Sequence, residues 1–180
     1  GEAGSGWHRR RRRPSPGVVL MSDTDHTAAA SEAVHVHLNF TMRGTVPLRL
    51  VDLLFRSTHL LVVEYGHLTP LDLTAGSPSR RAAAFADQIT SEGLTAALDA
   101  AETVTKLAYG SLDAVRVYDG GWIGRVAVAI EPSTGATTVV RVHAPVDIDQ
   151  FVAAVRSVLS SYAVAVERRD GLALEFNGLL

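Results

Sequence analysis

The pattern of apolar and polar positions changes once, from strand-like alternation to helical spacing, within residues 112–159. Larger apolar residues alternate with polar residues or alanine in three short runs that end at turns rich in glycine or proline: 115–118, 126–130 and 140–143. After Pro145 the spacing is that of one helical stripe, with Asp147 placed to cap the first amides; the stripe consists of Ile148, Phe151, Val152, Val155 and Leu159. The pattern predicts three antiparallel strands closed by an amphipathic helix.

Three more strands are predicted nearer the N-terminus. In residues 33–42, four apolar side chains face one side while His35, His37 and Asn39 face the other, as in a half-buried strand. The apolar runs 48–55 and 59–65 predict a second and a third strand, and Gly66 is expected to end the third. A loop punctuated by glycine and proline follows as far as residue 78.

Residues 79–108 change to helical spacing, which predicts two alanine-rich helices with a break at Gly93. The tail, residues 161–177, alternates again on both sides of Asp170 and Gly171, which predicts a terminal β-hairpin. This hairpin either closes the sheet or leaves an edge that pairs with another molecule.

The N-terminal residues differ from the rest of the chain. Residues 9–13 are all arginine, and residues 1–32 have no apolar period. We therefore expect residues 1–32 to be a disordered basic leader with a loose N-terminal segment, followed by a single domain at 33–180. The leader is either a basic arm or upstream sequence that precedes a start at Met21. From Met21 onward, 12 basic and 18 acidic residues give a net charge of −6, which argues against nucleic-acid binding.

Composition narrows the class of protein further. The 180 residues are 47% hydrophobic and 20% charged, as in ordinary globular proteins, and no apolar run reaches the roughly 18 residues of a membrane-spanning helix. We therefore predict a soluble, cytoplasmic protein with an α+β fold. The absence of cysteine excludes disulfides, thiolate metal sites and a cysteine nucleophile.

The order of these elements resembles the pleckstrin-homology-like superfamily, in particular its short bacterial and archaeal PH and GRAM-type members. The residues that carry the resemblance are 58–64 (THLLVVE), 112–121 (LDAVRVYDGG), 124–128 (GRVAV), 139–143 and the helix 147–159. The resemblance implies a bent antiparallel sheet or barrel capped by the C-terminal helix, with 79–108 as an inserted helical hairpin. Members of this superfamily bind lipids, peptides or partner domains and are seldom catalysts, so the resemblance implies a noncatalytic role.

The turn between the fourth and fifth predicted strands is the candidate contact surface. It carries one tryptophan and one arginine, residue types that concentrate at binding hot spots. The candidate partner-binding residues are Tyr118, Asp119, Trp122 and Arg125. The alternative is a tight turn whose Trp122 ring folds back onto the core.

Two histidines offer an alternative from another class. His35 and His37 are two apart on one predicted strand face, a spacing at which two imidazoles can bind one metal ion, with His59, His67 or His143 as a possible third ligand. This arrangement would suit a small metal-dependent enzyme. Solvent-facing histidines on a strand are the structural alternative.

Other chemistry finds little support. No glycine-rich nucleotide motif follows a strand, and we can defend no serine triad. The first loop offers only Arg43 and Arg49 to an anionic head group, which gives little support to lipid binding. We predict a noncatalytic binding or assembly module without a cofactor that recognises a protein partner or itself. Membrane-surface association is a further alternative, favoured only if the arginine leader is native.

Overall fold

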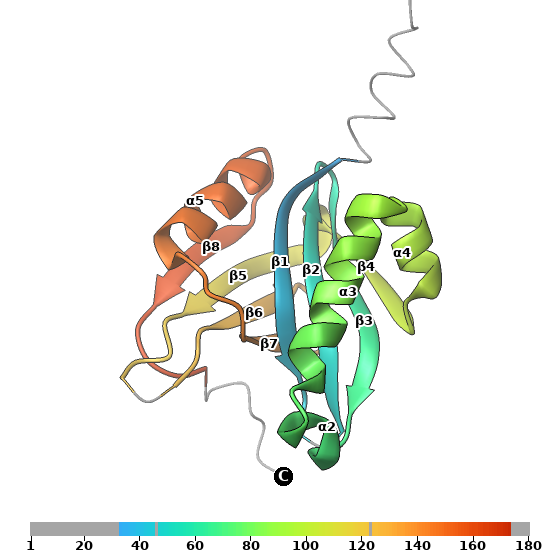
Figure 1. The fold of residues 1–180 in the computed structure, drawn as a ribbon. Helices are drawn as coiled ribbons and strands as arrows, with labels where there is room; N and C mark the ends of the chain where they lie inside the picture. Colours follow the sequence, from blue (N-terminus) through green and yellow to red (C-terminus); the bar gives the residue numbers. More distant parts are fainter. Residues whose placement is uncertain (1–32, 46, 123, 174–180) are drawn as a thin grey trace, which may run out of the picture.

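The computed structural model describes residues 33–45, 47–122 and 124–173. The predicted leader at 1–32 lies outside these ranges. Within them the chain forms one eight-stranded sheet with helices on both of its faces (Figure 1). The sheet is mostly antiparallel, so the predicted α+β class is confirmed.

The strands are β1 (Val34–Arg43), β2 (Leu48–Arg56), β3 (His59–Leu68), β4 (Thr103–Ala108), β5 (Leu112–Tyr118), β6 (Ala127–Pro132), β7 (Thr138–Val142) and β8 (Ala165–Arg169). Their order across the sheet is β4-β3-β2-β1-β7-β6-β5-β8. Neighbouring strands are antiparallel except β5 and β8, which are parallel. In Figure 1, β5 to β7 run across the direction of β1 to β3, and β1 joins the two halves.

The helices are α2 (Pro70–Thr74), α3 (Ser77–Ser91), α4 (Leu94–Ala100) and α5 (Ile148–Leu159), with a 3₁₀ turn, η1, at Tyr109–Ser111. The predicted N-cap of α5 is present, because the side chain of Asp147 accepts a hydrogen bond of 3.0 Å from the amide of Gln150. The predicted break at Gly93 separates α3 from α4.

The core lies on both faces of the central strands. In β2, Leu53 and Phe55 point into the main cluster with α5, whereas Leu54 packs against α3 on the other face. The ring of Phe55 meets the ring of Phe151 edge-on, with centroids 6.1 Å apart. The helix predicted at the end of the 112–159 pattern therefore buries its apolar stripe, as the spacing indicated.

Three details of the predicted secondary structure are wrong. Residues 103–108 form strand β4 rather than helix, because β-branched residues there pair with β3 in unbroken register. Strand β3 continues past Gly66 to Leu68. The predicted loop after β3 contains helix α2, which Thr69 and Asp72 start with a capping box.

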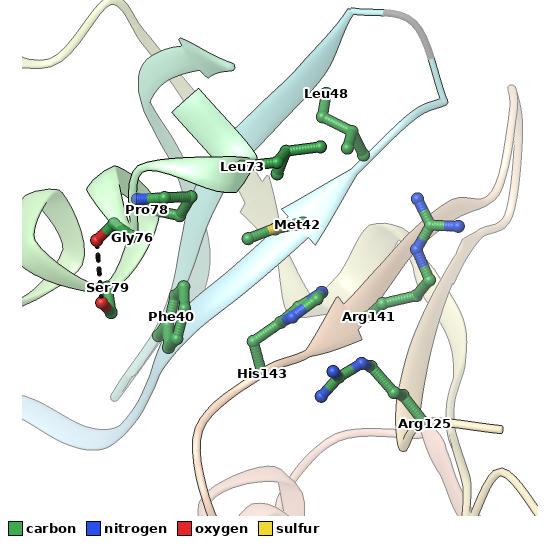
Figure 2. A pocket seen from close by; sticks show the side chains of 10 residues that line it. All are labelled: Phe40, Met42, Leu48, Leu73, Gly76, Pro78, Ser79, Arg125, Arg141 and His143. Carbon is green, nitrogen blue, oxygen red and sulfur yellow. Dashed lines mark hydrogen bonds between the residues drawn. The ribbon is translucent and has the colours of Figure 1, made fainter. Parts of the chain in front are cut away.

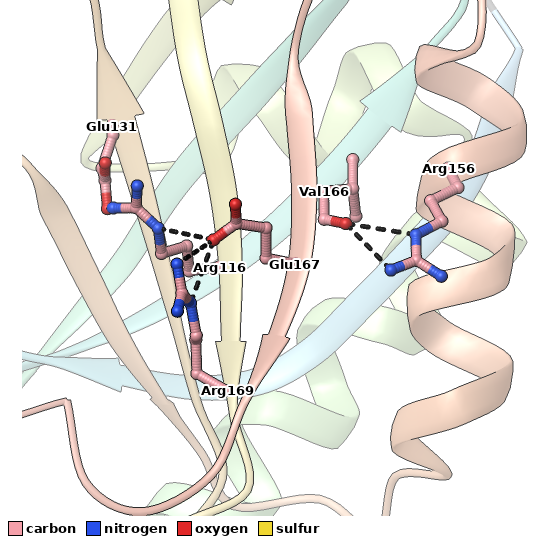
Figure 3. A network of polar contacts seen from close by, with 6 residues as sticks. All are labelled: Arg116, Glu131, Arg156, Val166, Glu167 and Arg169. Carbon is pink, nitrogen blue, oxygen red and sulfur yellow. Dashed lines mark hydrogen bonds and ion pairs between the residues drawn. The ribbon is translucent and has the colours of Figure 1, made fainter.

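The tail also differs from the predicted hairpin. Its first arm is strand β8, but β8 pairs in parallel with β5, and the second arm from residue 174 onward lies outside the described residues. Arg116 of β5 links Glu131 of β6 to Glu167 of β8, and Arg156 of α5 donates two hydrogen bonds, of 3.1 and 3.0 Å, to the carbonyl of Val166 (Figure 3). These contacts fix β8 between β5 and α5.

Replacement of Phe151 by alanine should test the packing of α5. Phe151 is 7% exposed, and truncating a buried phenylalanine costs roughly 3–5 kcal/mol of unfolding free energy. The neighbouring Gln150 is exposed, so Gln150→Ala should change stability by about 0.5 kcal/mol or less. Urea denaturation of the two variants measures the difference. Equal stabilities would show that α5 does not seal the core.

Candidate functional site

The turn after β5 is held by hydrogen bonds to the tail. The carboxylate of Asp119 accepts from the amides of Gly121 at 2.9 Å and Gly171 at 2.8 Å, and the amide of Gly120 donates to the carbonyl of Gly171 at 2.9 Å. The Gly121 bond is the main reason that the pKa of Asp119 lies below its ordinary value, with Gly171 and Arg168 contributing. Asp119 therefore organises the turn as an anion.

Glycine is required at position 120 of this turn. Its φ is +82°, and a Cβ there would lie 2.6 Å from the carbonyl carbon and oxygen of Arg125. The two ends of the turn thus approach more closely than any side chain permits.

Trp122 is the most exposed large apolar side chain of the described residues, with 95% of its surface accessible. Leu172 lies against the same turn, because a Cβ on Gly124 would lie 2.1 Å from its Cδ2 atom, and Leu172 is 37% exposed. We call Trp122 and Leu172 the tip surface. Tyr118 is only 5% exposed and packs with Ala127 and Ala129, so Trp122 is the aromatic side chain that this turn presents.

Arg125 lies apart from the tip surface, in a groove of about 510 Å³. The groove lies between β1, the start of β2, the segment just before β6, β7 with the residue that follows it, and the α2–α3 segment. Figure 2 shows one wall of apolar side chains and one wall of basic and imidazole side chains. The apolar wall consists of Phe40, Met42, Leu48, Leu73 and Pro78, and the other wall of Arg125, Arg141 and His143.

Strand register explains the polar wall. Ala127 pairs with Arg141, and the amide of Val142 donates to the carbonyl of Val126 at 2.8 Å, which carries Arg125 opposite His143. Burial, and then the charges of Arg125 and Arg141, lower the pKa of His143 to about 4. The imidazole is therefore neutral at pH 7, and the two guanidinium groups supply the positive charge.

The floor of the groove includes a strained residue. Phe40 has a φ of +50°, the only positive φ of a non-glycine residue in the described ranges. It lies in a bulge where the register of β1 against β2 shifts between Leu38 and Thr41. Its amide donates to the carboxylate of Asp52 at 3.0 Å, and its carbonyl accepts from the amide of His143 at 2.9 Å.

The two candidate metal ligands are occupied by different partners. Nε2 of His37 is 2.6 Å from Oδ2 of Asp52, and Nε2 of His35 is 2.8 Å from Oγ of Ser57. In residues 33–173, apart from positions 46 and 123, no three His, Cys, Asp or Glu side chains gather at one point to hold a metal. The metal hypothesis has no third ligand there.

The candidate third ligands lie elsewhere. His59 is buried beside Thr58, His67 pairs with Glu102 at 2.6 Å, and His143 lines the groove. The hollow beside His35, of about 470 Å³, is lined mainly by serines and apolar residues of α5 and its C-terminal end, and His35 is the only ionisable residue among the described ones that line it. A pair of His35 and Ser57 without an orienting carboxylate is a poor basis for catalysis.

The two arginines of the first loop are engaged with a carboxylate. Glu64 of β3 is buried and accepts from Arg43 at 3.1 Å and from Arg49 at 2.8 Å. The pair therefore neutralises a buried carboxylate and is not a free basic patch.

The described part of the chain includes no helix that could cross a membrane.

The sequence pattern identified Arg125 but missed the rest of the groove. In the sequence, Arg141 and His143 are polar positions of the alternating run 140–143, and His143 is also a possible metal ligand. The alternation in the two strands, joined by a turn at 132–135, was the available signal, because it places Arg125 just before one strand and Arg141 on the neighbouring strand. Nothing in the local sequence indicated that α2 would supply the opposite wall.

No protein-family model matches this chain, and no curated protein matches it either. Among solved structures, the chain is similar to the hSac2 domain from the human phosphoinositide phosphatase Sac2, with 10% sequence identity and a TM-score of 0.46. The similarity covers 86% of this chain and 92% of that domain.

Replacement of Asp119 by alanine should loosen the turn. The amides of Gly121 and Gly171 lose their acceptor, so their hydrogen exchange should become faster, as NMR can measure residue by residue. Asp113→Ala provides a control, because Asp113 accepts from the Ser133 side chain and touches neither amide. Unchanged exchange in the Asp119 variant would contradict the assigned role.

The pKa of His143 should be measurable by NMR titration of its imidazole and should lie near 4. Arg125→Gln removes one of the two positive charges that lower it, so the pKa should rise while burial keeps it below the ordinary value of 6.5. Lys106→Gln, which removes a charge from the edge strand β4, should leave the pKa of His143 unchanged. An equal rise in both variants would contradict the local origin of the shift.

The same shift predicts a pH dependence of stability. Because the folded-state pKa of His143 is lower than its unfolded value, the unfolded chain binds more protons between about pH 4 and 6.5, so this histidine makes stability rise with pH in that interval. His143→Gln should flatten that part of the profile in thermal melts at several pH values. A profile with the same slope would show that other groups dominate.

Proposed function

We propose that this protein is a noncatalytic binding module that recognises a protein partner, or a second copy of itself, through the tip surface. The observation that carries the proposal is Trp122, which is 95% exposed on a turn whose backbone is tied down by Asp119. These hydrogen bonds hold the backbone directly before Trp122 to the tail at Gly171.

Energetics support a contact role for this ring. A buried tryptophan removes about 150–250 Å² from water, and at roughly 25 cal/mol per Å² this corresponds to about 4–6 kcal/mol before entropy is counted. Tryptophan is also enriched among the residues that dominate binding energies at protein interfaces. A partner that covers Trp122 and Leu172 would gain this contribution, which the isolated chain leaves unused.

The alternative contact surface at the edge of the tail is less favourable. Figure 3 shows the carbonyl of Val166 in β8 directed toward α5, where Arg156 binds it. Arg168 pairs with Asp149 at 2.7 Å beside the same strand. Ion pairs and an occupied carbonyl oppose the addition of a further strand, so the tip surface is the better candidate.

The pleckstrin-homology-like relationship forms part of the same proposal. It is supported by the antiparallel sheet whose two halves cross, with α5 packed on the side that carries the main core. Partner recognition is a role that the resemblance implies. The cytoplasmic location stays a prediction.

Membrane-surface association stays a second hypothesis, because an exposed tryptophan also suits the interface of a bilayer. Glu64 already pairs with both arginines of the first loop and offsets one of their two charges, which weakens this hypothesis. The test below therefore includes vesicles.

Trp122→Ala should abolish partner capture without loss of stability. The full chain and its Trp122→Ala and Val104→Ala variants would serve as baits in native lysate, with quantitative mass spectrometry of the captured proteins and light scattering for self-association. Val104 is a matched control, since it is an exposed apolar residue on β4 at the other end of the sheet order. We expect a protein or a dimer that is lost with Trp122→Ala and kept with Val104→Ala.

Three outcomes would overturn the proposal. A large fall in melting temperature for Trp122→Ala would show that the ring stabilises the fold. Identical capture by all three baits would show that the tip surface is not the contact. Sedimentation with anionic vesicles that depends on Trp122, without any captured protein, would favour the membrane hypothesis instead.

A further inference from the structure

We propose that the groove between β1, β7 and the α2–α3 segment is a binding site for a small organic anion with an apolar body, such as a carboxylate or phosphate group on a short alkyl chain. This site is separate from the tip surface and does not depend on the proposed function. Its polar wall would bind the anionic group, and its apolar wall would cover the body of the ligand (Figure 2).

The charge of the groove supports an anionic ligand. Arg125 and Arg141 both line it, and none of the described residues that line it is acidic. This is notable in a chain with a net charge of −6 from Met21 onward. A guanidinium group binds carboxylate and phosphate through paired hydrogen bonds, so two of them beside a neutral imidazole form a suitable cradle.

The partners of the two arginines support the same conclusion. Nη2 of Arg141 donates to the carbonyl of Gly44, which fixes the side chain while leaving its charge uncompensated. Within the described ranges, the guanidinium of Arg125 makes no hydrogen bond or ion pair with another residue of the chain. Arg43 and Arg49, by contrast, are engaged with the carboxylate of Glu64, and Arg116 is engaged with those of Glu131 and Glu167.

The apolar wall supports a ligand with a hydrophobic body. Leu73 of α2 is 45% exposed, although it lies beside the buried Met42 and Pro78 in the groove. A leucine left half in water at the rim of an apolar hollow gains contacts when a ligand fills that hollow. The volume of about 510 Å³ falls within the range of small-molecule sites, roughly 300–1,000 Å³.

The floor of the groove is preorganised. Phe40 keeps its positive φ because Asp52 and His143 bind its amide and carbonyl, and its ring lies 5.6 Å from the imidazole of His143, centroid to centroid. Strained residues held in this way are concentrated at ligand sites. Phe40 of the apolar wall and His143 of the polar wall are therefore held in a fixed relative position.

The experiment uses octanoate as the probe, with octan-1-ol, octylammonium and inorganic phosphate as comparisons. Binding to the full chain is followed by calorimetry and by NMR shifts of the Met42 methyl group and the His143 imidazole. We expect octanoate to bind at least about tenfold more tightly than octan-1-ol or octylammonium, because a charged hydrogen bond contributes on the order of a tenfold change or more. The bound anion should also raise the pKa of His143.

Paired variants separate the two walls. Arg125→Gln should weaken octanoate binding about tenfold, whereas Lys106→Gln, which changes the net charge equally, should not. Leu73→Ser should weaken octanoate but leave phosphate unaffected. Leu71→Ser is its control, because Leu71 is a 77% exposed leucine of the same helix that does not line the groove.

Equal affinity for octanoate and octan-1-ol would overturn the proposal, as would equal effects of Leu71→Ser and Leu73→Ser. If Lys106→Gln weakened octanoate binding as much as Arg125→Gln, the net charge of the protein and not the local charge of the groove would explain the effect. That result would also overturn the proposal. Trp122→Ala should leave octanoate binding unchanged, so the site in the groove and the contact at the tip surface can fail independently.

Discussion

The hydrogen bonds of Asp52 tie β2 to β1 and β3, and β1 is the strand that joins the two halves of the sheet. This carboxylate is fully buried, a position that is costly unless donors surround it, and it accepts from His37, the amide of Phe40 and the hydroxyl of Tyr65. The bond to Phe40 holds the bulge in β1. Directly after the bulge, Thr41 and Met42 pair with Val142 and Arg141 of β7. Without the bulge, β1 would not present its edge to β7 in this register, and the groove would lose its floor.

Much of the sheet could be predicted from sequence, because five of its strands follow apolar alternation and two, β2 and β3, are continuous apolar runs that burial on both faces imposes. Helix α5 was equally predictable, since its stripe and its N-cap agree. Strand β4 was not. Its Val104 and Ala108 continue the four-residue spacing of the preceding helices, so only pairing with β3 decides between helix and strand. The parallel pairing of β8 could not be predicted either. The direction of β8 in the sheet depends on where α5, which precedes it in the chain, ends in space, and local residue spacing does not contain this information.

The candidate site was predictable only in part. A tryptophan next to glycines in a tight turn indicated a surface, and the structure places that ring in solvent. The groove draws on residues from five elements, β1, β2, α2, α3 and β7, and from the segments beside them. Their assembly depends on the register of β6 against β7 together with the placement of α2. Sequence composition could not reveal that Arg125 and Arg141 lack carboxylate partners among the described residues, because the chain as a whole has an excess of acidic residues.

The bond between Asp119 and Gly171 joins positions 52 residues apart. Since the carbonyl of Gly171 also accepts from Gly120, both polar backbone groups of one tail residue are committed to the loop that displays Trp122. The loop cannot be lengthened or shifted without a matching change in the tail, so the two stretches should vary together among relatives of this protein. A tag or fused domain attached behind residue 173 would begin beside Tyr118 and Ala127, at the base of that loop, whereas one attached before residue 33 would begin at β1.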